Sequence, residues 1–160
     1  MHTAEIEIIR TSDPTDATLT TSRALLGVVA RSLSEALEMV TLPQFRVMVI
    51  LASSGPLRMG ALAARAHSNI STFSRSLDRM VAGGWVQRVD SPDSRREVLI
   101  ELTLHGNQLV AHVTDRRREE IATIMARLSP ADQEKVGSAF ALFAAATGEP
   151  PVEDLLILGL

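Results

Sequence analysis

The sequence predicts a mainly α-helical fold with one small β-hairpin, in a single domain over residues 1–160, and three observations support this. Apolar residues make up 46% of the 160 residues, which is enough to bury one sizeable core. Aromatic residues make up only 3%, with no tyrosine, so the core must consist of Leu, Val, Ile, Ala and Met, which suit helix packing better than a β-sandwich. Strands are indicated only by two short runs on either side of a turn-rich segment at residues 91–96, and the second run alternates imperfectly between inward and outward positions.

The apolar positions in the first third of the chain predict two helices. They recur at helical spacing over residues 16–39 and again after Thr41. Thr41 is expected to cap the second helix, with Pro43 in its first turn, where a missing N–H costs nothing. Ser53-Ser54-Gly55-Pro56 should end that helix, because Gly and Pro interrupt regular structure. Residues 1–14 show no helical period and are either a short extended segment or a flexible arm.

The middle of the chain predicts two short helices separated by a tight turn. An extended piece at residues 57–59 leads into a helix over residues 60–66, and His67-Ser68-Asn69 forms the turn with capping side chains. The next helix is expected over residues 70–82, and Gly83-Gly84 should end it in the left-handed conformation. Its apolar residues are spaced three, four and three apart, which predicts one buried face made by Ile70, Phe73, Leu77 and Met80.

A hairpin and two further helices complete the predicted fold. Strands are expected over residues 85–90 and 97–103, joined by the positively charged turn at residues 91–96. A long helix should follow over residues 104–128. Ser129-Pro130 is a cap followed by proline at the first helical position, so a last helix is expected over residues 130–146. An apolar tail follows at residues 152–160.

The charge of the chain is unevenly distributed. Residues 57–96 contain seven Arg against three Asp, which gives this segment +4, and since the whole chain carries −3, the rest carries −7. A basic segment on an acidic body is what a DNA-binding surface on a separate scaffold should show, because only the reading face meets phosphate. A chance cluster of solvated arginines would give the same count.

Helix, tight turn, helix and hairpin in this order form the layout of a winged helix-turn-helix. The segments that carry this layout are Thr41-Leu42-Pro43-Gln44-Phe45 at the start of the second helix, Leu62-Ala63-Ala64-Arg65 in the first short helix, residues 71–80 (STFSRSLDRM) in the second short helix, Gly84-Trp85-Val86-Gln87-Arg88 before the wing, and Asp93-Ser94-Arg95-Arg96 through Leu102-Thr103 and Gly106 in the wing and after it. Together they resemble the MarR family of transcriptional regulators over roughly residues 20–147, and the resemblance makes the two short helices the positioning helix and the recognition helix.

The resemblance implies a DNA-binding part at residues 41–103 on a helical dimerisation part at residues 1–40 and 104–160. One position departs from the family pattern. Ser94 stands two residues before Arg96, where the family usually has an Asp that holds the last wing-tip arginine for the minor groove. Asp93 supports Arg95 instead if the register shifts, so both arginines are candidates for that contact.

The helix at residues 70–82 has the composition of a major-groove reader. Its outer face carries short polar and cationic side chains, and an arginine can pair bidentately with guanine. We expect Ser71, Thr72 and Arg75 to meet base edges. The residues expected nearer to phosphates are Ser68, Asn69, Ser74 and Arg79. An ordinary amphipathic surface helix is the alternative.

The arginines of the hairpin suit a narrow minor groove, whose negative potential attracts guanidinium groups. They are Arg88, Arg95 and Arg96, and we expect the last two to lie at the tip rather than along the strands. A charged, solvated turn is the alternative interpretation of the same residues.

These features predict a homodimeric repressor that binds a pseudo-palindromic operator on double-stranded DNA, since a two-fold axis places two reading heads on successive major grooves. The apolar residues of the first and last helices either form that interface or only complete a monomer core. The resemblance also implies a small phenolic or anionic effector that releases DNA. Phe45, Met48 and His112 are conceivable lining residues of its site, although core packing is the expected role of each. The alternatives are a winged-helix module without effector, in architectural DNA binding or in protein–protein contact.

Several other classes of site and location are excluded or not indicated by the sequence. The chain contains no cysteine, which excludes disulfides and Cys-ligated metals. The four histidines have no metal-binding spacing, and no phosphate-binding loop or nucleophile–base signature occurs, so we expect no enzyme activity and no cofactor. The absence of a membrane span or signal peptide predicts a cytoplasmic location. The run Asp115–Glu120 is expected to be a solvated helix face with local ion pairs. His67 is expected to cap the turn or contact phosphate.

Overall fold

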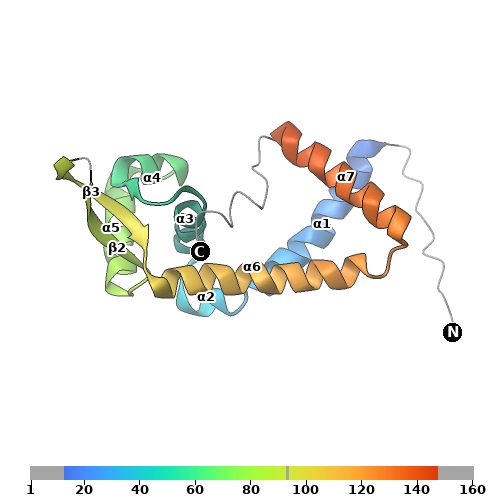
Figure 1. The fold of residues 1–160 in the computed structure, drawn as a ribbon, viewed down its shortest axis with the longest axis horizontal. Helices are drawn as coiled ribbons and strands as arrows, with labels where there is room; N and C mark the ends of the chain where they lie inside the picture. The colour runs from blue at the N-terminus through green and yellow to red at the C-terminus, as the bar shows by residue number, and fades with distance from the viewer. Residues whose placement is uncertain (1–12, 93, 148–160) are drawn as a thin grey trace.

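The computed structural model describes residues 13–92 and 94–147, without the side chains of residues 94–96 (Figure 1). A compact head at one end contains the short helices and a small sheet, and the long α6 runs from this head to the far end, where α1 and α7 lie. Residues 1–12 of the expected N-terminal arm and the whole apolar tail at residues 152–160 fall outside the described residues. The elements are α1 (Pro14–Leu33), α2 (Ala36–Met39), α3 (Leu42–Ser54), β1 (Leu57–Arg58), α4 (Met59–Arg65), α5 (Ile70–Ala82), β2 (Val86–Ser91), β3 (Ser94–Leu102), α6 (Leu104–Met125) and α7 (Pro130–Thr147).

The first predicted helix is divided in two, which corrects the continuous helix expected over residues 16–39. α1 ends at Leu33, where the Ser34 N–H donates to the carbonyl of Arg31, three residues back rather than four. The chain then turns and begins again as α2 at Ala36. Ala36 is completely buried, so the break lets the chain turn into the core of the head.

Local caps determine the bounds of α3, as predicted. The Thr41 hydroxyl accepts a hydrogen bond from the Gln44 N–H (3.4 Å), and the Gln44 side chain accepts one from the Thr41 N–H (2.8 Å). This reciprocal pair satisfies two N–H groups that the first turn leaves free. Gly55 ends the helix with φ 70°, in the left-handed region that favours glycine.

The three strands form an antiparallel sheet in the order β1-β3-β2. The hairpin is tighter than expected, because β2 ends at Ser91, β3 begins at Ser94, and these two residues pair with each other. Arg95 and Arg96 therefore lie along β3, not in a turn between strands, which corrects their predicted place at the tip. The register shifts between Asp90 and Ser91, and this irregularity allows backbone pairing to continue to Ser94.

The core fills the space between α2, α3, α4, α5, the sheet and the first turns of α6. Its largest fully buried side chains include Met48, Leu62, Leu77 and Met80. Ile70 does not join them, although its spacing predicted burial: its relative exposure is 55%. It is the first residue of α5, and it lies next to the exposed turn that precedes the helix.

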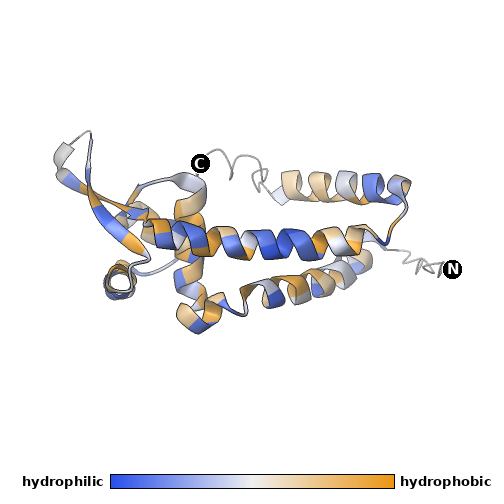
Figure 2. Cartoon of the chain, turned by 60° about the horizontal axis from the view of Figure 1, so that its bottom comes forward, coloured by the Kyte–Doolittle hydropathy of each residue, from blue (hydrophilic) through white to orange (hydrophobic). Residues whose placement is uncertain are grey.

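The helices at the far end expose apolar side chains. None of the residues of α7 is buried, and Figure 2 shows apolar segments along α1 and α7 on either side of the strongly polar middle of α6. The large exposed side chains in this part are Leu19, Leu25, Leu26, Ile121, Ile124, Phe140, Leu142 and Phe143. Within the described part of the chain, no helix is long and apolar enough to cross a membrane.

Candidate DNA-binding surface

The turn between α4 and α5 sets the direction of the recognition helix. His67 adopts φ 49°, a left-handed conformation that costs a non-glycine residue about 1–2 kcal/mol. Asn69 then caps α5, since its side-chain oxygen accepts hydrogen bonds from the Ser71 N–H (3.0 Å) and the Ser71 hydroxyl (2.8 Å). The expected capping turn is therefore present, and the carbonyl oxygen of the Asn69 side chain is engaged within the protein.

α5 has one buried and one open face, and its bounds agree with the predicted residues 70–82. Phe73, Leu77 and Met80 are buried against the head. Ser71, Thr72, Arg75 and Arg79 are exposed, whereas Ser68 and Ser74 are half-buried. Residues 71, 75 and 79 are four apart, so they form one line along the helix.

Arg88 lies in the middle of β2 rather than at the tip, and it is not free. Its guanidinium donates to Asp78 of α5 at 2.6 Å, and both side chains are largely exposed. This ion pair connects the hairpin to the recognition helix. The sequence pattern assigned Asp78 no role, because two residues ten apart on different elements show no periodic signal.

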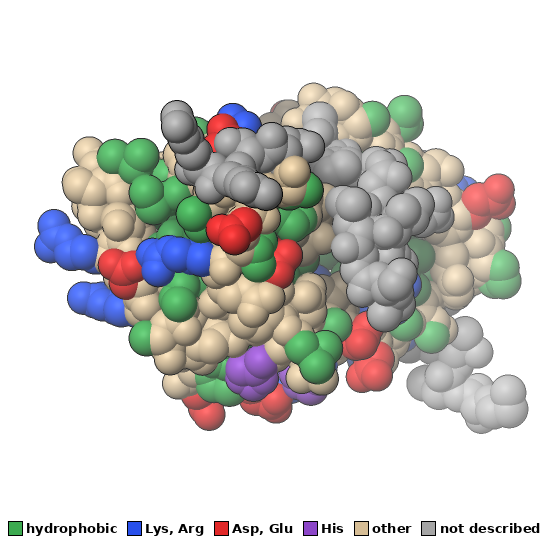
Figure 3. Space-filling model, turned by 60° about the vertical axis from the view of Figure 1, so that its left-hand side comes forward, with side chains coloured by type: hydrophobic (Ala, Val, Ile, Leu, Met, Phe, Trp, Pro, Cys, Tyr) green, Lys and Arg blue, Asp and Glu red, His purple; other side chains and the backbone are tan. Residues whose placement is uncertain are grey.

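The positive charge of the head is distributed as separate side chains. In Figure 3, several Lys or Arg side chains project from one edge of the face that this view presents, with isolated acidic side chains between them. Arg75 and Arg79 make no ion pair or side-chain hydrogen bond with the described residues, whereas Arg58 pairs with Glu97 of β3 at 2.6 Å. The backbone of Arg95 and Arg96 continues β3 toward the end of the hairpin.

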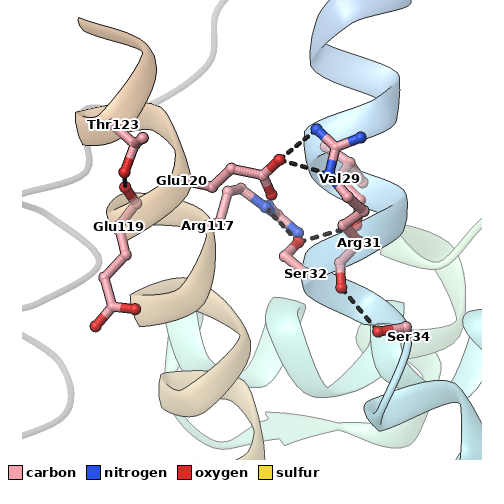
Figure 4. A network of polar contacts seen from close by, with 8 residues as sticks. All are labelled: Val29, Arg31, Ser32, Ser34, Arg117, Glu119, Glu120 and Thr123. Atoms are coloured by element: carbon pink, nitrogen blue, oxygen red, sulfur yellow. Dashed lines mark hydrogen bonds and ion pairs between the residues drawn. The ribbon is translucent and has the colours of Figure 1, made fainter. Parts of the chain in front are cut away.

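A second polar network lies far from this surface, between α1 and α6 (Figure 4). Arg31 of α1 pairs with Glu120, and Arg117 donates to the buried Ser32 hydroxyl at 3.2 Å. Partial burial lowers the pKa of the Arg117 guanidinium. The charged run at residues 115–120 therefore makes contacts across to α1 rather than the local ion pairs that were expected.

Glu35, between α1 and α2, also contacts this run. Hydrogen bonds from His112 (3.2 Å) and from Arg116 hold the pKa of the Glu35 carboxyl below its ordinary value. His112 is thus an exposed polar contact, which corrects the packing role expected for it. Phe45 and Met48 are buried core residues, as expected, whereas His112 is exposed.

Comparison with known proteins agrees with this fold. The sequence profile of the MarR family matches residues 40–98. An HTH-type transcriptional regulator of Mycobacterium bovis, Mb0904, is 30% identical over 70% of this chain and 78% of its own length. Across the curated regulators to which the chain is similar, the match spans between 46% and 78% of their length.

Solved structures extend the likeness over most of the chain. RV1404 from Mycobacterium tuberculosis is 40% identical, with a TM-score of 0.77 over 84% of this chain and 92% of that one. Two structures share the fold at lower identity and each cover 84% of this chain. A mutant of S. aureus MepR bound to an oligodeoxyribonucleotide is 18% identical over 98% of its length (TM-score 0.61), and NadR in complex with 4-hydroxyphenylacetate is 22% identical over 94% of its length (TM-score 0.55).

The curated relatives are HTH-type transcriptional regulators, which are not enzymes. The layout of α4, the turn, α5 and the β2–β3 hairpin is that of the winged helix-turn-helix predicted from the sequence. The chain belongs to the MarR family of HTH-type transcriptional regulators.

Proposed function

We propose that the chain is a homodimeric cytoplasmic repressor that binds a pseudo-palindromic operator on double-stranded DNA. The observation that carries this proposal is the open face of α5, where Ser71, Thr72, Arg75 and Arg79 project from a helix whose opposite face is buried. Such a face fits the major groove, because it is not bulky and can form hydrogen bonds with base edges. Residues 41–103 form the DNA-binding part, and residues 1–40 and 104–160 form the dimerisation part.

The side chains of α5 and the hairpin are assigned to three kinds of DNA contact. Ser71, Thr72 and Arg75 contact base edges, and Arg75 supplies a bidentate pair for guanine. The phosphate contacts come from Ser68, Asn69, Ser74 and Arg79, with the amide NH₂ of Asn69 as its free donor. Arg88, Arg95 and Arg96 contact the minor groove from the hairpin.

The dimer interface is formed by the exposed apolar side chains at the far end of the molecule. Phe140, Leu142 and Phe143 of α7 are 42%, 75% and 55% exposed, and Ile121 and Ile124 of α6 add to this surface. Exposed apolar side chains gathered at one end of a molecule indicate an interaction site. A two-fold axis here sets two heads about 34 Å apart, one helical turn of DNA.

The test is DNA binding by purified protein, measured by fluorescence anisotropy on DNA from its own promoter and on unrelated DNA over a range of salt concentrations. We expect sequence-selective binding that weakens steeply with salt. Arg75→Ala should cost about 1–3 kcal/mol on the operator and relax the preference at one base position. Arg127→Ala, which removes an exposed arginine after α6, is the control and should leave binding unchanged.

Failure of the wild-type protein on promoter DNA, together with no enrichment from a random-sequence pool, would leave the winged head as a protein-interaction module.

A small phenolic or anionic effector is part of the proposal. Its support is the family and the shared fold of NadR, whose solved ligand, 4-hydroxyphenylacetate, is a phenol with a carboxylate. An effector that binds one arrangement of the two heads better than the other shifts the population and weakens DNA binding. A thermal-shift screen of aromatic acids should find compounds that raise the melting temperature and release the operator. If the protein is a regulator without an effector, none of these compounds should raise its melting temperature or release the operator.

A further inference from the structure

A hollow of about 410 Å³ lies beside the recognition helix and adjoins the surface described above. It is bounded by the first turns of α3, the α4–α5 turn and one side of α5. Its apolar wall includes the buried Val47 and Phe73. Ser68, Thr72 and Ser76 add hydroxyl groups, and no acidic side chain lines it.

Two side chains of the hollow can carry positive charge, and neither has a counter-ion among the described residues. Arg46 of α3 is exposed and forms no ion pair or side-chain hydrogen bond with this part of the chain. The His67 side chain is likewise exposed and unpaired there, at the backbone position with φ 49°. The hollow between α1 and α6 differs, since it is lined by Glu119 and Glu120 as well as by arginines.

We propose that this hollow binds an oxyanion, and that in the operator complex the oxyanion is a backbone phosphate held by Arg46 and His67. Ser68 and Thr72 belong both to the hollow and to the proposed DNA-binding face of α5, so the two surfaces are continuous. DNA lying along α5 would thus reach α3 at its first turns. This inference rests on the proposed function and adds a contact on α3 that the α5 and hairpin residues do not include.

A phosphate contact has a measurable signature that differs from base reading. Losing one contact lowers the slope of log Kobs against log salt by about 0.9 for each bound head. It also weakens binding by the same factor on operator and on unrelated DNA, because phosphates carry no sequence information. A base-reading residue would change the preference among operators instead.

The experiment compares Arg46→Gln with the wild type on operator and unrelated DNA across a salt series. Arg127→Gln is the matched control, since it removes the same charge from the end of α6 that lies far from the head (Figure 1). We expect Arg46→Gln to lose affinity equally on both DNAs with a reduced salt slope, and Arg127→Gln to behave as wild type. His67→Gly tolerates the left-handed backbone, and should give a smaller loss of the same kind.

A further arm distinguishes DNA phosphate from free phosphate. DNA binding is repeated in phosphate and in chloride at equal ionic strength, and melting temperatures are measured without DNA. The site is supported if phosphate inhibits DNA binding by the wild type but not by Arg46→Gln, and if Arg46→Gln also binds DNA more weakly. Stabilisation by phosphate with unchanged DNA binding in Arg46→Gln would make free phosphate the occupant and overturn the DNA contact.

Three other results would contradict the proposed phosphate contact of Arg46. Equal affinity and salt slope in Arg46→Gln and Arg127→Gln would overturn the inference while the proposed function stands. A change of operator preference in Arg46→Gln would assign base reading to Arg46. No DNA binding by the wild type would overturn both proposals together.

Discussion

Asp78 holds Arg88 on the surface that we propose to face DNA, so one carboxylate competes with DNA for a hairpin arginine. Replacing Asp78 by alanine frees the guanidinium and removes a negative charge close to phosphate. We expect Asp78→Ala to bind unrelated DNA several-fold more tightly, with a salt slope that increases by about 0.9 per head. Because both partners are exposed, the free energy of unfolding should fall by less than about 1 kcal/mol.

Anisotropy titrations with Asp78→Ala and with the control Asp115→Ala, an exposed carboxylate on α6, measure this effect. Equal DNA affinity for these two variants and the wild type would show that Arg88 does not exchange Asp78 for DNA.

Glu35 permits a test of the polar contacts that it makes with His112 and Arg116 of α6. Its pKa is lowered first by the hydrogen bond from His112 and then by Arg116, so folding favours the ionised carboxylate. This contribution to stability is present above the ordinary pKa of the carboxyl and is lost as the pH falls through the lowered pKa. His112→Ala should raise the pKa of Glu35 toward its ordinary value, as measured by NMR titration of the side-chain carbon. An unchanged pKa in that variant would mean that Arg116 alone maintains it.

The junction between the hairpin and α6 depends on the close approach of two elements. A Cβ atom added to Gly106 would lie 2.2 Å from the carbonyl oxygen of Trp85, which is backbone and cannot move aside cheaply. Thr103 completes the junction, since its hydroxyl caps α6 and donates to the carbonyl of Gly84 at 2.6 Å.

Gly106→Ala should therefore lower the free energy of unfolding by about 1–3 kcal/mol. Gly137→Ala on α7 is the matched control, because no atom lies within 4 Å of the added Cβ and alanine favours a helix by up to about 1 kcal/mol. Urea denaturation of both variants checks the prediction. If Gly106→Ala and Gly137→Ala lowered the free energy of unfolding by the same amount, the close contact at Gly106 would not explain the loss.

The helices also show which structural features could be predicted from the sequence and which could not. α5 was predicted with its observed bounds because its signals are local: Asn69 caps one end, and Gly83 and Gly84 end the other. The break between α1 and α2 was not predicted, because it depends on the packing of Ala36 into a core formed by distant residues. The same holds for the candidate site. The exposed polar face of α5 follows from helical periodicity, whereas the Asp78–Arg88 pair and the hollow that Arg46 shares with His67 arise only from folding.

At the scale of the whole molecule, the elongated shape separates the proposed DNA-binding head from the apolar far end (Figure 1). The far end has exposed phenyl and aliphatic groups and no reading face, so we predict that it joins two chains. Phe143→Glu places a charge on this surface without touching the head. The variant should be monomeric in sedimentation equilibrium at concentrations where the wild type is a dimer.

Loss of the dimer should also lower operator affinity by about 10²-fold or more, because the second head no longer binds from within the same complex. Leu104→Glu is the control, since Leu104 is 75% exposed at the start of α6 beside the head, far from α7. A Phe143→Glu protein that stays dimeric and binds the operator as the wild type does would move the interface elsewhere. A monomer with unchanged operator affinity would show instead that one head alone supplies the specificity.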